Sequence, residues 1–141
     1  MAATKVLVDT GPLVAYWNES DSHHEWAVRQ WASLADPVYT CEAVISEAAF
    51  LLRDDGLESD NLWTALERGI VRVEFDFEAQ KPDLLRLLRK YRNQPMSVAD
   101  ACLVRLSELT NRSAIFTTDE DFSVYRRNGR GLIPVIAPFN L

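Results

Sequence analysis

Two acidic residues in this 141-residue chain stand just beyond apolar runs that are typical of buried strands. Asp9 directly follows the run at 6–8, and Asp119 comes three residues after the run at 114–116. Ligands of an open parallel sheet bind beyond the carboxyl ends of its strands, so we expect both acids at one sheet edge. The structural alternative for each is the cap of a helix or turn.

Two further acids lie on predicted helices. All neighbours of Glu47 at three and four residues are apolar, which predicts that it faces the core: Ala43, Val44, Phe50 and Leu51. A lone buried carboxylate costs on the order of several kcal/mol, so Glu47 needs a cation, a proton or a partner, and a buried ion pair with an arginine is the alternative. Asp100 shares a helix face with Leu103 and Val104, and with Ser97 it also fits a capping box.

Acids at two strand ends and on two inward helix faces converge on one crevice, and this convergence predicts a metal site. Mg²⁺ and Mn²⁺ prefer carboxylate and water oxygens, and Mg²⁺ sites keep waters that a substrate displaces. One or two such ions activate a water for attack on a phosphodiester and stabilise the leaving oxygen. No histidine or lysine base is required, and the acids alone suit DNA and RNA equally.

The elements that must position these acids alternate between strand and helix. Apolar or alternating segments predict strands at 5–8, 38–41, 70–75, 114–116 and 134–137. Helical spacing predicts helices at 20–34, 42–53, 59–68, 78–91 and 97–109, with a helical turn at 120–125 and Pro12 in the first turn of a helix after Asp9. This order predicts an α/β fold with a central parallel sheet covered on both faces, and the length fits one domain over 1–141.

The net charge of −6 argues at first against a nucleic-acid partner, because phosphate contacts come from lysine and arginine. Much of the positive charge is nevertheless gathered in two clusters, each close in sequence to a candidate acid: Arg86, Arg89, Lys90 and Arg92, and then Arg126, Arg127 and Arg130. We take Arg89, Arg126 and Arg127 as candidate nucleic-acid contacts. A solvated helix face and a solvated loop are the alternative.

Several other kinds of site are disfavoured. Cys41 and Cys102 stand far apart, and His23 and His24 complete no zinc ligand set, so neither a disulfide framework nor structural zinc is expected. No stretch approaches the roughly 20 apolar residues that span a bilayer. We expect a soluble cytoplasmic protein without membrane contact.

Four segments resemble, in order and spacing, the motifs of the PIN domain, in particular those of the VapC-type toxins of bacterial toxin–antitoxin systems. They are 6–13, 43–47, 97–101 and 116–122, and the likeness covers nearly the whole chain. The resemblance implies an α/β/α sandwich. It also implies roles for individual residues: metal-site acids at Asp9, Glu47, Asp100 and Asp119, supporting hydroxyls at Thr10 and Thr117, and a more variable acid beside the site at Asp121.

The resemblance further implies an endoribonuclease that uses Mg²⁺ or Mn²⁺, cleaves RNA, forms a homodimer and is silenced by a cognate antitoxin. An aromatic surplus in the helices of Trp26, Trp31 and Trp63 also favours the dimer, although all three could instead lie in the core. Two functional alternatives stay open: a non-catalytic PIN-like domain that only binds a partner, and a PIN nuclease of RNA processing without an antitoxin.

Two other enzyme classes resemble this chain near Asp9 but do not fit the rest of the sequence. The segment Asp9-Thr10-Gly11 matches the loop of retroviral-type aspartic proteases, but those enzymes are all-β, and a protease leaves Glu47 and Asp100 unexplained. Phosphotransfer domains of the haloacid dehalogenase kind need an acid at position 11, where this chain has glycine.

Overall fold

A computed structural model describes residues 4–35 and 37–139 and places five parallel strands in one central sheet, in the order β3-β2-β1-β4-β7. These strands are β1 (Lys5–Val8), β2 (Val38–Thr40), β3 (Val71–Val73), β4 (Ser113–Phe116) and β7 (Val135–Ile136). The predicted α/β class with a central parallel sheet is therefore confirmed. Each of the five strands overlaps its predicted range, and β4 alone extends beyond it, by one residue at its start.

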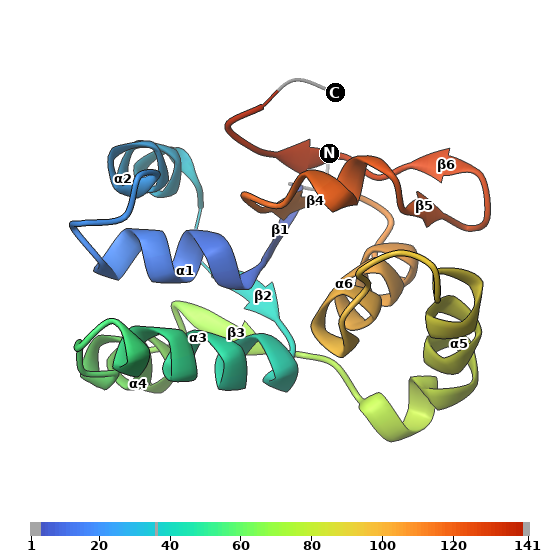
Figure 1. Cartoon of the computed structure of the whole chain (residues 1–141), viewed down its shortest axis with the longest axis horizontal. Helices are drawn as coiled ribbons and strands as arrows, with labels where there is room; N and C mark the ends of the chain where they lie inside the picture. Colours follow the sequence, from blue (N-terminus) through green and yellow to red (C-terminus); the bar gives the residue numbers. More distant parts are fainter. Residues whose placement is uncertain (1–3, 36, 140–141) are drawn as a thin grey trace.

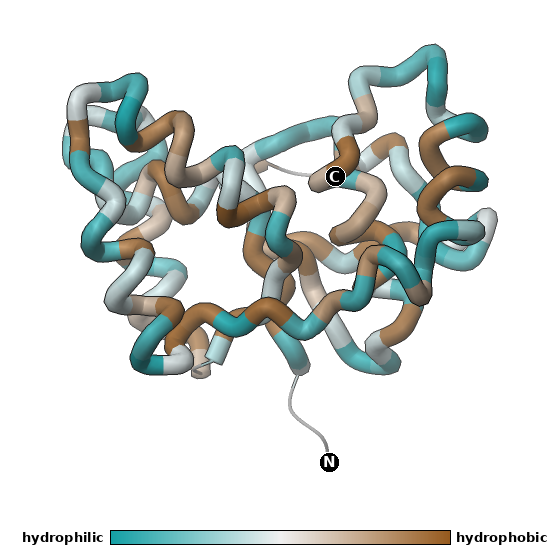
Figure 2. Tube along the Cα trace, turned by 90° about the horizontal axis from the view of Figure 1, so that it is seen from below, coloured by the Kyte–Doolittle hydropathy of each residue, from teal (hydrophilic) through white to brown (hydrophobic). Residues whose placement is uncertain are grey.

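Helices flank this sheet, with α1 to α4 on one side and α5 and α6 on the other (Figure 1). They are α1 (Thr10–Trp17), α2 (His24–Ser33), α3 (Glu42–Asp54), α4 (Asp60–Glu67), α5 (Phe77–Lys90), α6 (Val98–Leu109) and the short 3₁₀ helix η1 (Glu120–Ser123). Hydrophobic and hydrophilic residues alternate along the helices at both ends of the molecule (Figure 2), as expected for helices that turn one face to a core.

The core is built around the two middle strands. Every residue of β4 is buried, and so are Val6, Leu7 and Val8 of β1. The two strands pair in parallel, with Val8 opposite Phe116. A strand that is buried on both faces consists almost entirely of apolar residues, so it is easy to recognise in the sequence.

The order of the strands creates the crevice in which a ligand of such a sheet binds. From β1 the chain first moves to β2 and β3 on one side, and it then returns through α5 and α6 to β4 on the other side. β1 and β4 are therefore neighbours whose connections leave in opposite directions. A crevice opens at this switch point, beyond the carboxyl ends of the two strands.

Side-chain caps fix where three helices begin. The carboxylates of Asp9 and Asp76 accept hydrogen bonds at the start of α1 and α5, and the Ser97 hydroxyl accepts from the backbone N–H of Asp100 at 3.0 Å at the start of α6. Pro12 lies in the first turn of α1, as predicted. Gly11 is needed beside it, because a Cβ at this position would collide with the Thr118 hydroxyl in the loop after β4.

Two local predictions differ from the structure. The helix expected over 20–34 begins only at His24, because side chains at Asn18 and Asp21 bond to the backbone of Ser20 and His23 and form turns instead. The segment 126–132, in which no strand is predicted, is a short hairpin of β5 (Arg126–Arg127) and β6 (Gly131–Leu132). Its turn has positive φ at Asn128 and Gly129, an Asn-Gly pair that favours such turns.

Among the described residues, no helix combines the length and the apolar character needed to cross a membrane.

Candidate metal centre

Three of the four predicted acids meet at the crevice between β1 and β4. Asp9 follows β1, Asp119 follows β4 and caps η1, and Asp100 is the third residue of α6. One carboxylate oxygen from each lies within 4.8 Å of the other two, and in the described part of the chain this is the group of acids close enough to share a metal ion. Asp9 and Asp100 are buried, and Asp119 is partly buried.

The buried hydroxyl of Thr117 ties two of these acids together. It donates to Oδ2 of Asp9 at 2.8 Å, and its oxygen accepts the backbone N–H of Asp119 at 2.9 Å. The other Asp9 oxygen, Oδ1, accepts the backbone N–H of Thr10 at 2.8 Å. The supporting position predicted for Thr117 is thus occupied by a hydroxyl that contacts both strand-end acids.

Asp100 is held from two directions through its Oδ2 atom. The backbone N–H of Ser97 donates to this oxygen at 3.2 Å, which completes the capping box of α6. The hydroxyl of Tyr125 donates to the same oxygen at 3.0 Å. From the sequence, a helix cap and a site acid are alternative roles for Asp100. In the structure Asp100 is both, because its carboxylate has two oxygens.

Burial makes negative charge in this crevice costly. It raises the pKa of Asp9 from 3.8 to about 7, even though hydrogen bonds from Thr117 and Thr10 oppose the change, and the charges of Asp100 and Asp119 raise it further. Burial also raises the pKa of Asp100, with a contribution from Asp119. A bound cation would compensate the charge that burial and mutual repulsion disfavour.

The donor set fits a hard divalent cation. All three candidate ligands are carboxylate oxygens, which Mg²⁺ and Mn²⁺ prefer. In addition, the buried Thr10 hydroxyl next to Asp9 has no hydrogen-bond partner among residues 4–35 and 37–139. A hydrated cation in the crevice would give such an orphaned oxygen a partner, since buried polar groups are normally hydrogen-bonded through protein or water.

The prediction that Glu47 faces the core is wrong, because the side chain is exposed. The buried stripe of α3 runs along Val44, Ala48 and Leu52, whereas Phe50 and Leu51, which suggested an inward face, are themselves exposed. Helix α3 has more apolar surface than the core covers, so apolar neighbours of Glu47 do not show that Glu47 itself is buried. Glu47 therefore lies outside the group formed by Asp9, Asp100 and Asp119.

Asp121 lies beside the group and not within it. Its backbone N–H donates to Oδ1 of Asp119 at 2.8 Å, and burial together with the Asp119 charge raises the pKa of its own carboxyl. Tyr125 has no counterpart among the predicted site residues. Nothing in the sequence marks its hydroxyl as a site group, since one aromatic residue in a predicted helical turn is usually core.

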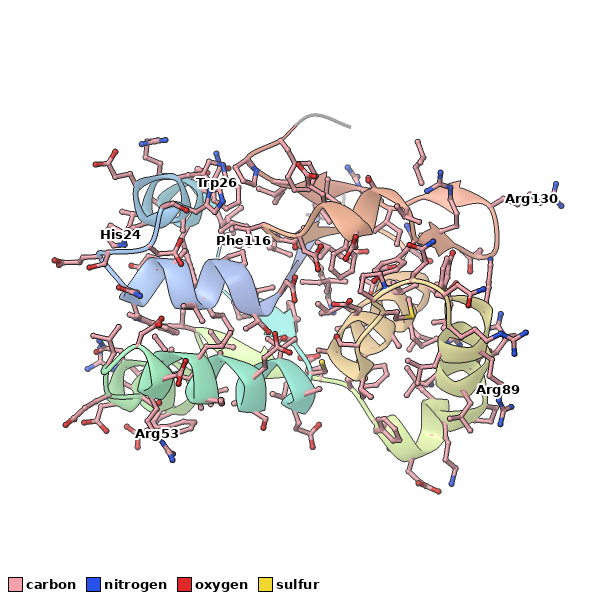
Figure 3. All side chains as sticks on the ribbon, viewed as in Figure 1. His24, Trp26, Arg53, Arg89, Phe116 and Arg130 are labelled. Carbon is pink, nitrogen blue, oxygen red and sulfur yellow. The ribbon has the colours of Figure 1, made fainter. Side chains whose placement is uncertain are left out.

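The candidate nucleic-acid contacts divide into two kinds. The Arg126 guanidinium donates to the carbonyls of Ser123, Val124 and Tyr125, and that of Arg127 donates to the carbonyl of Thr110 at 2.6 Å. Both side chains are half-buried, so each has a structural role in the hairpin. Arg89 and Arg130, in contrast, extend outward at one edge of the molecule (Figure 3).

Known proteins share both the sequence and the fold of this chain. The chain is similar to the ribonuclease VapC26 of Mycobacterium tuberculosis (strain ATCC 25618 / H37Rv), with 25% identity over 93% of this chain and 99% of the relative. Its structure is similar to the crystal structure of Mycobacterium tuberculosis VapC20, described as a Sarcin-Ricin loop cleaving toxin, with a TM-score of 0.73 and 26% identity over 85% of this chain and 94% of that one. The family model for the PIN domain matches residues 6–128, so this chain belongs to the PIN-domain family.

Proposed function

We propose that this single-domain chain is a cytoplasmic, metal-dependent endoribonuclease, the toxin component of a type II toxin–antitoxin system. The observation that carries the proposal is the group formed by Asp9, Asp100 and Asp119, which Thr117 and Tyr125 hold in place. The choice of RNA over DNA rests on the relatives, which are named as a ribonuclease and as a toxin that cleaves the Sarcin-Ricin loop.

In this proposal the three aspartates hold Mg²⁺ or Mn²⁺ over the crevice. When bound, the ion would act as a Lewis acid that activates a water and stabilises the charge on the leaving oxygen of the phosphodiester. The chain itself fixes the ligand oxygens, because each aspartate accepts hydrogen bonds from backbone or hydroxyl groups. Ligands held in this way need little rearrangement when the ion and the RNA bind.

Glu47 is proposed as a fourth acid at the edge of the site, as the family resemblance implies. Its helix α3 packs against α1, which Asp9 caps, and against α6, whose first turn contains Asp100. Because the side chain of Glu47 is exposed, a change of its rotamer costs no core packing. This position suits a ligand that engages only when the ion or the RNA is present.

The RNA backbone is proposed to cross a surface that we call the basic face: Arg89, Lys90, Arg92 and Arg130. All four side chains are exposed, and within residues 4–35 and 37–139 none of them forms a salt bridge. Lys90 contacts the carbonyl of Gly129 at 3.3 Å, which joins the end of α5 to the hairpin turn. The next residue, Tyr91, packs on Tyr125, so the basic face adjoins the residues that hold Asp100.

A cognate antitoxin is proposed to silence the enzyme by placing an arginine among the carboxylates. A guanidinium fork binds two carboxylates through charge-assisted hydrogen bonds and would occupy the position of the metal ion. The alternative of a non-catalytic PIN-like domain has no support in the site, because such domains lack acids that this chain retains.

A homodimer is proposed to form through a groove between α3 and α4. The groove has a volume of about 660 Å³ and is lined by Ile45, Ala49, Phe50, Arg53, Asp54 and Trp63. Trp63 is 47% and Phe50 57% exposed, whereas Trp31 is buried and Trp26 is partly covered by Phe116. In a two-fold arrangement, Arg53 of one copy can pair with Asp54 of the other, and the apolar residues cover each other.

The variant Asp9→Asn tests the nuclease. We expect it to abolish metal-dependent cleavage of RNA, because the crevice loses a charged ligand while asparagine keeps the cap of α1. Expression of the wild-type chain should arrest growth, and expression of Asp9→Asn should not. The matched control is Asp76→Asn, which makes the same change at the exposed cap of α5. Full cleavage by Asp9→Asn, or equal loss in the control, would contradict the assignment.

The metal-free protein should lose stability as the pH rises. Folded Asp9 keeps its proton up to a pKa of about 7, whereas the unfolded chain releases it near 3.8, so the free energy of unfolding falls between these values. Mn²⁺ should reverse the loss above about pH 7, where it no longer competes with the proton. Denaturant titrations across this range, with and without Mn²⁺, measure both effects. The loss should be smaller in Asp9→Asn, because Asp100 also contributes to it, and equal profiles in the two proteins would show that Asp9 has its ordinary pKa.

Removal of charge from the basic face should weaken RNA binding without changing the chemical step. The double variant Arg89→Ala, Arg130→Ala is expected to raise KM several-fold at low salt and to leave kcat unchanged. The slope of log affinity against log salt should shrink by about one for each phosphate that the variant no longer neutralises. Arg29→Ala, an exposed arginine on α2 at the other side of the molecule, is the control. An unchanged slope in the double variant would place the RNA elsewhere.

The proposed dimer is tested by placing a charged residue in the groove between α3 and α4. Light scattering should give twice the chain mass for wild-type protein at micromolar concentration and a single-chain mass for Phe50→Glu. The same substitution at another exposed apolar residue, Val124→Glu, should leave the dimer intact. A monomeric wild-type protein would remove the dimer from the proposal.

A further inference from the structure

Tyr125 is a fully buried tyrosine whose hydroxyl group is directed at a site acid. The side chain is 0% exposed, and its O–H donates to Oδ2 of Asp100 at 3.0 Å. A buried tyrosine hydroxyl needs a partner, and here the partner is a carboxylate of the candidate metal centre.

We propose that Tyr125 is a positioning residue for the metal centre: its hydroxyl orients the Asp100 carboxylate so that Oδ1 is presented to the cation. The inference rests on the proposed function and adds a residue to the same site. Two donors, the Ser97 backbone N–H and the Tyr125 hydroxyl, converge on Oδ2. Oδ1 receives neither of these two donors and is therefore the oxygen that we expect a metal ion to bind.

The packing around the Tyr125 ring holds its hydroxyl group in one position. The ring makes edge contacts with Tyr91, at a centroid distance of 5.2 Å, and with Phe122, at 5.3 Å. Rings packed at steep angles on two sides, of 69° and 87°, cannot swing without disturbing the core. The oxygen therefore stays where the Asp100 carboxylate requires it.

The same contacts couple Asp100 to the segment that carries Asp119. Phe122 lies in η1, the short helix that Asp119 caps, and the backbone N–H of Tyr125 donates to the carbonyl of Asp121 at 3.2 Å. Thr117 links Asp9 to Asp119, and Tyr125 links Asp100 to the turn that follows Asp119. Together these two hydroxyl groups fix all three acids relative to one another.

The neighbouring Tyr91 provides a matched comparison within the same cluster. It is also buried, and its hydroxyl accepts the backbone N–H of Arg126 at 2.9 Å without contacting an acid of the site. Replacement of either tyrosine by phenylalanine removes one oxygen atom and keeps the ring. A purely structural role for Tyr125 would make the two substitutions equivalent.

The experiment compares Mn²⁺ affinity in wild-type protein, Tyr125→Phe and Tyr91→Phe, measured without RNA by the electron paramagnetic resonance signal of free Mn²⁺. Removal of a hydrogen bond that supports a metal ligand typically weakens metal binding about 10-fold to 100-fold. We expect a loss of about tenfold or more in Tyr125→Phe and less than about twofold in Tyr91→Phe. Melting temperatures of the metal-free variants should be lowered by similar amounts.

In cleavage assays at subsaturating Mn²⁺, Tyr125→Phe should lower kcat and leave KM for RNA unchanged, and added Mn²⁺ should restore part of the rate. Wild-type Mn²⁺ affinity in Tyr125→Phe, or equal losses in the two variants, would overturn the positioning role. A wild-type protein that binds Mn²⁺ but cleaves no RNA would contradict the proposed function. In that case the ratio of the Mn²⁺ affinities still decides the role of Tyr125.

Discussion

The site depends on one hydroxyl group that joins residues at opposite ends of the sequence. Thr117 donates to Asp9 and accepts from the backbone of Asp119, although Asp9 and Thr117 are 108 positions apart in the chain. This contact is possible only because β1 and β4 are paired neighbours whose carboxyl ends stop at the same level. The parallel pairing of two buried strands therefore sets the position of two acids, and α6 supplies the third.

The sequence predicts the parts of the site that depend on regular structure. Asp9 and Asp119 follow apolar runs that form β1 and β4, and the carboxyl ends of such strands meet at one edge in a parallel sheet. Asp100 is predictable for a related reason, since the Ser97 capping box fixes the start of α6 and the side on which its third residue lies. Periodicity and capping are local properties, so a single sequence reveals them.

The features that the sequence does not reveal depend on long-range packing. Glu47 has apolar neighbours but is exposed, because the core covers only the stripe of α3 that contains Val44, Ala48 and Leu52. Tyr125 reaches Asp100 from a segment 25 positions away, and no local pattern marks that contact. Arg126 and Arg127 belong to a charged cluster, yet their guanidinium groups bond to backbone carbonyls of the fold. The sequence shows the charge and hydropathy of each residue, but the role of the residue depends on the groups that it contacts in the folded chain.

The central claim is that Asp9, Asp100 and Asp119 form one site for a divalent cation at the carboxyl edge of the sheet. The most direct measurement is the anomalous diffraction signal of Mn²⁺ in crystals of the protein grown with that ion. The account predicts a strong peak within coordination distance of oxygens from all three aspartates. A well-ordered crevice with no peak between these carboxylates, in crystals containing saturating Mn²⁺, would contradict it.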